Sequence, residues 1–372
     1  MAGLHAGRHE HAVVALEAAL MRIAQVSPLV EPVPPVTYGG TERVVAYLTE
    51  ALVDLGHEVT LIASGDSRTR ARLVPASERA LRLDPDCHDA LMHHIRQVEL
   101  VAGLAGSFDL IHFHTGFLHM PVARRLPTPS LTTLHGRLDV PDIVPLMRSM
   151  PDVPLVSISD AQRRPLPDAN WQDTVYNGIP HDLHAYSAAT GDYAAFVGRI
   201  SPEKRVDRAI AIARRAGLPL KVAAKVDPVD RAYYDQVIAP LLHDGGVEFL
   251  GEIDEPAKGA LLGRARALLF PIDWPEPFGM VVIEALACGT PIVAWGNGSV
   301  PELIEHGRTG WIVDSVEDGA EALSRIGEID RRACREAFER RFTAARMARD
   351  YVAVYERLLG HSGRPRLEVL SA

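Results

Sequence analysis

The sequence contains few cysteines, and they follow no pattern. Cys87, Cys288 and Cys334 form neither a metal-binding motif nor an even set of disulfide partners. Such usage is typical of a reducing compartment, so we expect a cytoplasmic protein. Internal repeats and low-complexity tracts are lacking as well.

An excess of positive charge is also lacking. The chain has 39 Lys and Arg against 48 Asp and Glu, which gives a net charge of -9. A nucleic-acid backbone attracts clustered Lys and Arg, so this balance argues against a nucleic-acid partner.

Long apolar runs are missing, even near the N-terminus. Within residues 1–20 the apolar run is about ten residues long and is broken by Glu17, whereas a membrane span needs about 20. The same segment has no well-formed cleavage site for a signal peptide. We therefore predict an N-terminal extension over residues 1–20 and no stable membrane insertion.

The chain does contain short apolar runs that alternate with helical patterns, which predicts βαβ units and parallel sheets. Its 372 residues exceed one typical core and favour two domains. We predict an α/β protein with two Rossmann-like domains facing a cleft, over 21–185 and 186–342, followed by a helical segment over 343–372. The expected strands are 23–27, 57–64, 109–114, 130–134, 155–158, 174–176, 194–197, 221–226, 247–250, 268–272, 291–295 and 311–313, with a clear helix at 90–104 and a linker at 181–192.

Residues 274–302 carry the strongest chemical pattern, WPEPFGMVVIEALACGTPIVAWGNGSVPE. Each proline restricts the residue before it, so a helix should begin near Phe278 or Gly279. A glycine and a proline, Gly289 and Pro291, should end that helix. Glu276 is therefore expected just ahead of a helix N-terminus.

Two acids in this stretch, Glu276 and Glu284, lie eight positions apart. A helical spacing would separate them by roughly 12 Å, whereas a glycosidase places its two carboxyl groups about 5 to 10 Å apart. The pair suits an elongated ligand, and the N–H groups of Phe278, Gly279 and Met280 between them would bind phosphate. This arrangement is the outline of a nucleotide sugar. The plainer interpretation makes Glu276 a cap and Glu284 a surface acid.

The segments EPFG, EALACGTPIVA, GSVPELI and TGWIV resemble the C-terminal signature of retaining glycosyltransferases of family 4, which have the GT-B fold. In that family the first acid lies by the donor sugar and the second binds the ribose, which assigns these roles to Glu276 and Glu284. The resemblance also implies that the last helix crosses back to the first domain. It implies retaining transfer of a hexose, most simply from a UDP-sugar, to an acceptor. No cofactor and no metal ion are expected.

Other loops gain a role from the same resemblance. The glycine loop at Gly39 and Gly40 would lie against the donor pyrophosphate, although capping by Thr41 is the simpler interpretation. Arg199 and Lys204 flank a helix start at Ser201 and would bind the diphosphate. Weaker matches assign base contacts to Leu250, Glu252 and Ile253, acceptor contacts to Tyr38, His114 and Asp139, and further donor contacts to Asn297, Gly298 and Ser299.

His135 ends a predicted strand and matches the family's histidine at the transferred sugar. A core histidine is the alternative. His112 and His114 share one strand face, but no third and fourth ligand completes a zinc site. An Asp-x-Asp pattern at Asp84 and Asp86 lies in a proline turn, where a solvated loop is the better interpretation.

The chain departs from the family pattern at two places. Residues 222–227 replace a glycine-rich turn, and Lys225 there either reaches the phosphates or is solvated. Residues 179–182 also differ from the usual run.

The sequence has three rival functional interpretations. A nucleotide-sugar epimerase has the same fold, and a non-catalytic nucleotide-sugar-binding subunit would keep the donor site. An NAD-dependent oxidoreductase needs a Gly-x-Gly-x-x-Gly loop, which neither half contains. A soluble small molecule or a saccharide is the expected acceptor, since no basic amphipathic helix marks a membrane-docking face.

Overall fold

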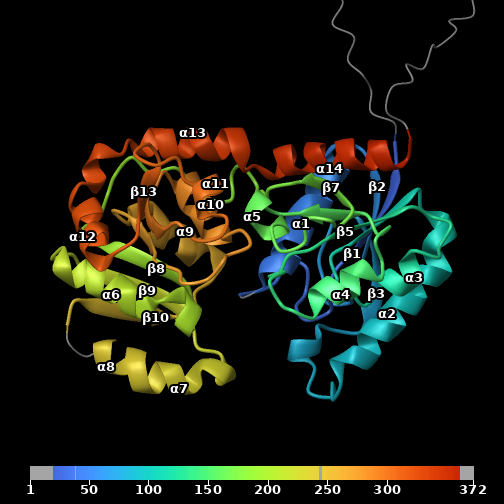
Figure 1. Ribbon diagram of the computed structural model, residues 1–372, viewed down its shortest axis with the longest axis horizontal. Coiled ribbons are helices and arrows are strands. Elements are labelled where there is room, and N and C mark those ends of the chain that lie inside the picture. Colours follow the sequence, from blue (N-terminus) through green and yellow to red (C-terminus); the bar gives the residue numbers. More distant parts are fainter. Residues whose placement is uncertain (1–19, 38, 243–244, 361–372) are drawn as a thin grey trace, which may run out of the picture.

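The computed structural model describes residues 20–37, 39–242 and 245–360. The predicted extension, except for residue 20, and the C-terminal segment beyond residue 360 lie outside the described residues. Within these ranges the chain forms two parallel sheets that lie side by side and are covered by helices (Figure 1). The predicted fold class is therefore confirmed.

The first sheet has strands β1 (Arg22–Val26), β2 (Glu58–Ser64), β3 (Arg72–Ser77), β4 (Leu110–Phe113), β5 (Ser130–Thr133), β6 (Leu155–Ser157) and β7 (Trp171–Thr174). They are arranged in the order β3, β2, β1, β4, β5, β6, β7. Its helices are α1 (Gly40–Asp54), α2 (Ala90–Leu104), α3 (Met120–Ala123), α4 (Ile143–Arg148) and α5 (Asp160–Arg163). The strand order reverses between β1 and β4, which is where such sheets bind ligands.

The second sheet has strands β8 (Ala194–Arg199), β9 (Leu220–Lys225), β10 (Val247–Gly251), β11 (Leu268–Phe270), β12 (Ile292–Trp295) and β13 (Gly310–Val313). Their order is β10, β9, β8, β11, β12, β13, with the reversal between β8 and β11. The helices of this half are α6 (Val206–Arg215), α7 (Arg231–Tyr233), α8 (Ala239–Leu242), α9 (Glu255–Arg264), α10 (Met280–Cys288), α11 (Val300–Leu303), α12 (Val316–Ser324) and α13 (Arg331–Arg341).

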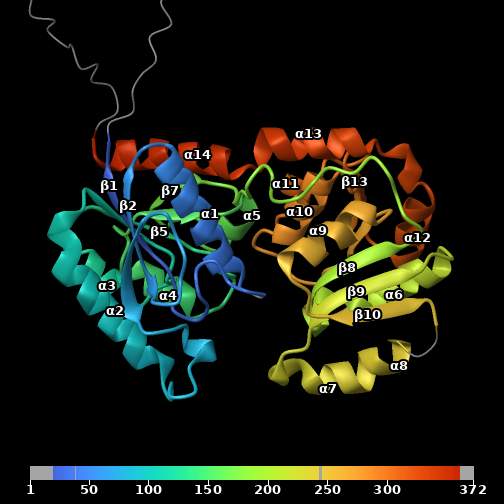
Figure 2. The ribbon, with the colours of Figure 1, turned by 180° about the vertical axis from the view of Figure 1, so that it is seen from behind.

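The last helix, α14 (Ala344–Leu358), completes the core of the first half, as predicted. Helices α13 and α14 follow one another along the same side of the molecule, α13 over the second sheet and α14 over the first (Figures 1 and 2). Met347 and Tyr351 of α14 are fully buried and belong to one apolar cluster with Ile23 of β1 and Leu48 of α1. Because successive strand residues face opposite ways, Val26 of β1 packs instead with α2.

The two chain segments that connect the halves are bonded to each other. The N–H of Ile179 donates to the carbonyl of Phe342 at 3.0 Å, and the N–H of Ala344 donates to the carbonyl of Ile179 at 2.8 Å. Arg346 of α14 donates to the carbonyl of Tyr176 at 2.5 Å. These bonds fix where α14 leaves the second half and reaches the first.

Three local predictions need correction. Strand β3 was missed because it is a half-exposed edge strand that contains Pro75, a residue that weakens a strand pattern. The strand expected at 174–176 lies earlier, at β7. Ser201 precedes only a short 3-10 turn, with Pro202 at its first position, and its side chain makes no capping bond. Helix α6 begins at Val206, after Arg205 in a left-handed conformation with φ 54°.

No helix within the described ranges combines the length and the apolar character that a bilayer span requires.

The burial of α14 leads to a stability prediction. Met347→Ala should lower the free energy of unfolding by about 2–5 kcal/mol, because it opens a cavity in a packed core. The control is Arg349→Ala on the exposed face of the same helix, which should change stability by less than about 0.5 kcal/mol. Urea unfolding measures both, and equal small effects would show that α14 is not part of the core.

Candidate active site

A cavity of about 510 Å³ lies between the two halves, and both contribute to its wall. The volume is in the range of small-molecule sites. The cavity lies at the carboxyl ends of strands in both sheets: β8 ends at Arg199, β9 ends at Lys225, and His135 follows β5. This is the position at which open parallel sheets bind ligands.

Two helices direct uncapped N-termini at the cavity. Helix α1 begins after Gly39 and α10 begins after Gly279, and neither N-cap position makes a side-chain capping bond. Thr41 is therefore not the cap of α1, and both glycines line the cavity. The first N–H groups of a helix lack intrahelical partners and carry a partial positive charge, so both ends favour an anion.

The loop before α10 is held by two serine residues. Ser299 donates its N–H to the carbonyl of Glu276 at 3.0 Å and its hydroxyl to the carbonyl of Phe278 at 2.6 Å. Ser159, from the first half, donates its hydroxyl to the carbonyl of Pro277 at 2.7 Å. Neither serine is among the described residues that line the cavity. Pro277 has no N–H, but a trans peptide points its C=O and N–H in opposite directions, so the N–H groups of Phe278 and Gly279 point away from these two serines.

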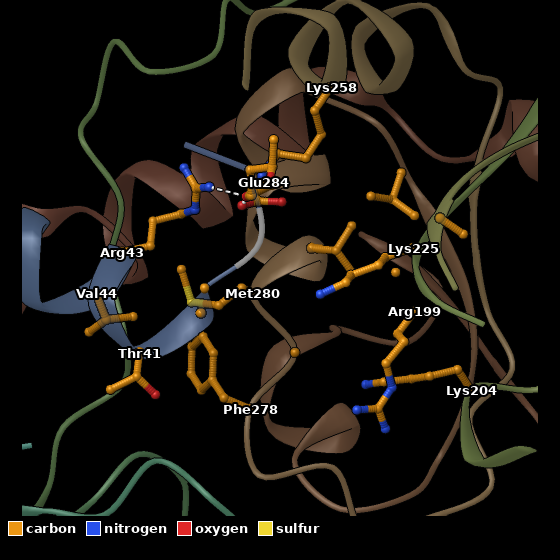
Figure 3. A pocket seen from close by; sticks show the side chains of 18 of the residues that line it. Thr41, Arg43, Val44, Arg199, Lys204, Lys225, Lys258, Phe278, Met280 and Glu284 are labelled. Atoms are coloured by element: carbon orange, nitrogen blue, oxygen red, sulfur yellow. Dashed lines mark hydrogen bonds and ion pairs between the residues drawn. The ribbon is translucent and has the colours of Figure 1, made fainter. Parts of the chain in front are cut away.

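Figure 3 shows three cations on one side of the cavity, Arg199, Lys204 and Lys225, which all come from the second half. Each has acidic partners. Arg199 contacts Glu203 at 2.5 Å, and Lys225 contacts Asp227 at 2.9 Å. The acids hold the cations in place around the cavity.

The carboxylate of Glu276 pairs with the ammonium of Lys204 and accepts from the indole N–H of Trp274 at 2.8 Å. Lys204 also lies 5.0 Å from the centroid of the Trp274 ring. Glu276 is only 9% exposed, so these two neighbours, and not solvent, hold its carboxylate in position.

Glu284 lies in a second charged cluster on the cavity wall. Its carboxylate is 2.7 Å from the ammonium of Lys258, which also lies 2.9 Å from Glu255. Glu255 pairs in addition with Arg43 of α1, and its other oxygen lies 3.2 Å from Nε2 of His184. Burial alone would raise the pKa of Glu255, but the His184 contact and the two cations hold it well below its usual range.

The ligand atoms of His184, Glu255 and Glu284 lie within 4.8 Å of one another, a spacing that a metal ion could use. Lys258 already bonds both carboxylates, so a protein ammonium supplies the positive charge at this point.

His135 forms part of the cavity wall, and its Nε2 lies 2.9 Å from Nδ1 of His114. Burial lowers the pKa of His135 to about 4, so the imidazole is neutral near pH 7. His114 is only 3% exposed and lies behind His135. The expectation that His114 lines the cleft is thereby corrected, because His135 separates it from the cavity.

Most of the residues predicted for the donor site line this one cavity. They are Gly39, Gly40, His135, Arg199, Lys204, Glu252, Ile253, Glu276, Phe278, Gly279, Met280 and Glu284. Leu250 and Asp139 are not among the described lining residues, and Tyr38 lies outside the described residues. Asp139 pairs with Arg137 at 2.7 Å, and Arg137 lies 5.8 Å from the centroid of the Trp274 ring, which lines the cavity.

Sequence reasoning missed several cavity residues. Arg43 and Lys258 carry no recognisable motif. Arg43 pairs with Glu255 of the other half, and Lys258 pairs with Glu284 of another helix as well as with Glu255 of its own. Glu31 and Arg82, which pair at 3.0 Å on the first half, were missed for the same reason. Asn297, Gly298 and Ser299 lie behind the loop and support it, and the described cavity wall does not include them.

Comparison with known families agrees with this geometry. A model described as "Glycosyltransferase Family 4" matches residues 38–182, and one described as "Glycosyl transferases group 1" matches residues 187–340. The chain belongs to glycosyltransferase family 4. The two matches together span most of the chain, and the transferase has the GT-B fold.

Individual relatives are distant. The transferase is 27% identical over 349 residues to a phosphatidyl-myo-inositol mannosyltransferase of Mycolicibacterium smegmatis, covering 83% of this chain and 86% of that one. The structure of AviGT4, a glycosyltransferase involved in avilamycin A biosynthesis, matches with a TM-score of 0.70 and 25% identity over 92% of this chain and 99% of that one. Anabaena HepE in complex with UDP and glucose matches with a TM-score of 0.69 and 19% identity over 91% and 100%.

The support of the loop by Gly298 can be tested. Gly298 has φ +60°, and a Cβ there would lie 2.4 Å from the backbone N and O of Glu276. Gly298→Ala should push the loop into the cavity and lower kcat/KM for glycosyl transfer by about 100-fold, since catalysis is sensitive to displacements of 1 Å.

Gly217→Ala is the matched control, because Gly217 has φ +66° but no atom within 4 Å of a built Cβ. It should lower stability by about 1–2 kcal/mol through backbone strain alone and leave kcat/KM unchanged. Equal losses of activity in the two variants would mean that strain, not loop displacement, is responsible.

Proposed function

We propose that the transferase moves a hexose from a UDP-sugar to an acceptor, with retention of the anomeric configuration and without a metal ion. The observation that carries the proposal is the order of groups in one cavity. Glu276 and Glu284 lie on either side of the uncapped start of α10, and Arg199 and Lys204 face the same space.

In the proposed complex the donor lies along this order of groups. The uracil lies by Glu252 and Ile253, and the ribose hydroxyls bond to Glu284. The diphosphate lies between the start of α10 and the cations of Arg199 and Lys204. Phosphate is well suited to this position, because helix N-terminal N–H groups and a planar guanidinium both bind its oxygens. The hexose then lies between Glu276 and His135.

The proposed reaction breaks the bond between C1 of the hexose and the diphosphate oxygen. An oxocarbenium-like state forms, and the acceptor oxygen attacks C1 on the face from which the diphosphate leaves. The acceptor proton passes to the departing phosphate oxygen, so charge and atoms balance. Arg199, Lys204 and the N–H groups of α10 stabilise the negative charge as it grows, which is the largest contribution that fixed groups make to such steps.

The proposed division of labour follows the two halves. Residues 186–342 bind the donor, and residues 21–185 bind the acceptor, a soluble small molecule or a saccharide, through the loops at Tyr38 and Asp139. The name of one relative, a mannosyltransferase, supports transfer of a hexose. Another relative is described in complex with UDP and glucose, which supports UDP as the nucleotide. UDP-glucose is the first donor to try.

The reaction products distinguish glycosyl transfer from two alternative functions. A nucleotide-sugar epimerase of the same fold would release an isomerised sugar without an acceptor, and a non-catalytic subunit would bind the donor without turning it over. The charged groups around α10 favour transfer, because a pure binding site has no need to stabilise a leaving phosphate.

The electrostatic role of Arg199 can be measured. Arg199→Ala should lower kcat by at least about 100-fold with a smaller loss of donor affinity, because the guanidinium acts mainly on charge that develops in the transition state. Arg215→Ala removes an exposed guanidinium of the same half, paired with Glu317 at 3.4 Å, and should keep wild-type turnover. Turnover of Arg199→Ala within a few-fold of the parent would overturn the mechanism.

The absence of a metal requirement is a separate prediction. Turnover of UDP-glucose in a chelating buffer should equal turnover in buffer with added magnesium or manganese, since arginine, lysine and two helix N-termini supply the positive charge. Loss of activity on chelation, restored by a divalent ion, would contradict this prediction.

A further inference from the structure

A continuous row of buried hydrogen bonds runs from the cavity into the first half. His135 bonds to His114 at 2.9 Å, and Nε2 of His114 bonds to Oε1 of Gln25 at 2.8 Å. The amide nitrogen of Gln25 donates to the hydroxyl of Tyr355 at 3.1 Å. Gln25 and Tyr355 are fully buried, and His114 is 3% exposed. No solvent competes for these bonds, so each donor must face an acceptor of its neighbour.

The donors and acceptors along this row can be assigned one after another, starting from Tyr355 of α14. Because the amide nitrogen of Gln25 is turned towards Tyr355, its oxygen faces His114. A carbonyl oxygen only accepts, so Nε2 of His114 carries the proton. Burial, together with the neighbouring His112 and His135, holds the pKa of His114 well below its usual range, so the ring has a single proton. Its Nδ1 is therefore a bare lone pair.

The same reasoning fixes His135. Its Nε2 faces the lone pair of His114 and must donate, which places the ring's only proton on Nε2. The Nδ1 atom of His135 has no hydrogen-bond partner among the described residues. It is also absent from the buried polar atoms that lack a partner, so it is accessible. His135 lines the cavity, so this bare nitrogen is open to it.

We propose that His114 and Gln25 are positioning residues that hold His135 in the tautomer with a lone pair towards the transferred sugar. His135 then accepts a hydrogen bond from a sugar hydroxyl and does not donate one. The inference rests on the proposed function for the identity of the sugar, whereas the tautomer follows from the protein alone. A consequence is selectivity: the sugar position that faces His135 must carry a proton donor.

This selectivity distinguishes substrates of similar shape. A hydroxyl or an amine satisfies the lone pair of His135, whereas fluorine, a carbonyl or a carboxylate presents a second acceptor to it. The lone pair also lies near the ring that becomes positive in an oxocarbenium-like state, where the negative end of a dipole is favourable.

The tautomer is measured directly by NMR of the protein with 15N-labelled histidine, in which the His135 signals are identified by their loss in His135→Gln. We expect the protonated nitrogen of His135 to be Nε2 in the parent. In Gln25→Met, which keeps the size of the side chain but removes its amide, His135 should populate the other tautomer. His119→Gln is the control, because His119 is a buried histidine of the same half that bonds Thr132 at 2.8 Å and is outside the row. It should leave the His135 signals unchanged.

The substrate test uses UDP-glucose analogues in which each sugar hydroxyl is replaced in turn by hydrogen or by fluorine. At one position, both replacements should lower kcat/KM by about threefold to tenfold, the effect of one lost hydrogen bond. In Gln25→Met, replacing the sugar hydroxyl that faces His135 should lower kcat/KM by a smaller factor than in the parent protein. In His119→Gln, the factor should be the same as in the parent protein.

Two results would overturn the inference. One is a parent protein in which His135 carries its proton on Nδ1. The other is a Gln25→Met variant in which replacement of each sugar hydroxyl lowers kcat/KM by the same factor as in the parent protein at every position. If no nucleotide sugar is turned over, the proposed function fails, but the NMR result still decides the tautomer.

Discussion

The position of the loop before α10 controls the chemistry of the whole cleft. Three consecutive carbonyls of that loop are held on its far side by Ser299 and Ser159, which leaves the N–H groups of the helix start facing the cavity. Gly279 ahead of the helix has φ +90°, a conformation that glycine adopts without strain. One of the two serines comes from each half of the protein. The uncapped N-terminus of α10 is therefore positioned by the contact between the halves, and not by its own sequence alone.

The charges of the cleft are paired before any ligand arrives. Lys204 is held by Glu276, and Arg199 is held by Glu203 with Asp230 at 3.3 Å. These pairs keep long flexible side chains at fixed positions, so the diphosphate of the proposed donor would meet oriented cations and would not have to order them. Fixed dipoles and charges of this kind stabilise a transition state without reorganisation at the moment of reaction. The acids also limit the positive charge of the empty site.

Local patterns in the sequence predicted local structure well. The proline and glycine positions around α10 gave its start and its end correctly, because these residues act on the backbone within a few positions. Helix α2 was predicted to the residue for a similar reason. Most of the predicted donor-site residues also line one cavity. Glu276, Gly279 and Glu284 belong to a single stretch of sequence, and Arg199 lies at the end of a strand, so local patterns were enough to find them.

What depends on distant contacts was not predictable. Arg43 pairs with Glu255 of the other half, and Lys258 pairs with Glu284 of another helix, and nothing in the local sequence identifies these two pairs. His114 was assigned to the cleft because it ends a strand, but it is 3% exposed and bonds to His135, which follows β5 and lines the cavity. Which of two adjacent strand-end histidines reaches the cavity depends on sheet packing, which a single sequence does not contain.

The corner around Glu284 links the proposed ribose contact to the fit between the halves. Glu284 is 3% exposed, and a buried carboxylate is stable only with a partner. Lys258 serves both Glu284 and Glu255, so one ammonium faces two carboxylates. The second cation is Arg43, which α1 brings from the other half. Glu255 therefore joins one cation from each half, Arg43 and Lys258, and Lys258 in turn holds Glu284. The position of the Glu284 carboxylate thus depends on the contact between α1 and α9, and the N-termini of α1 and α10 line the same cavity.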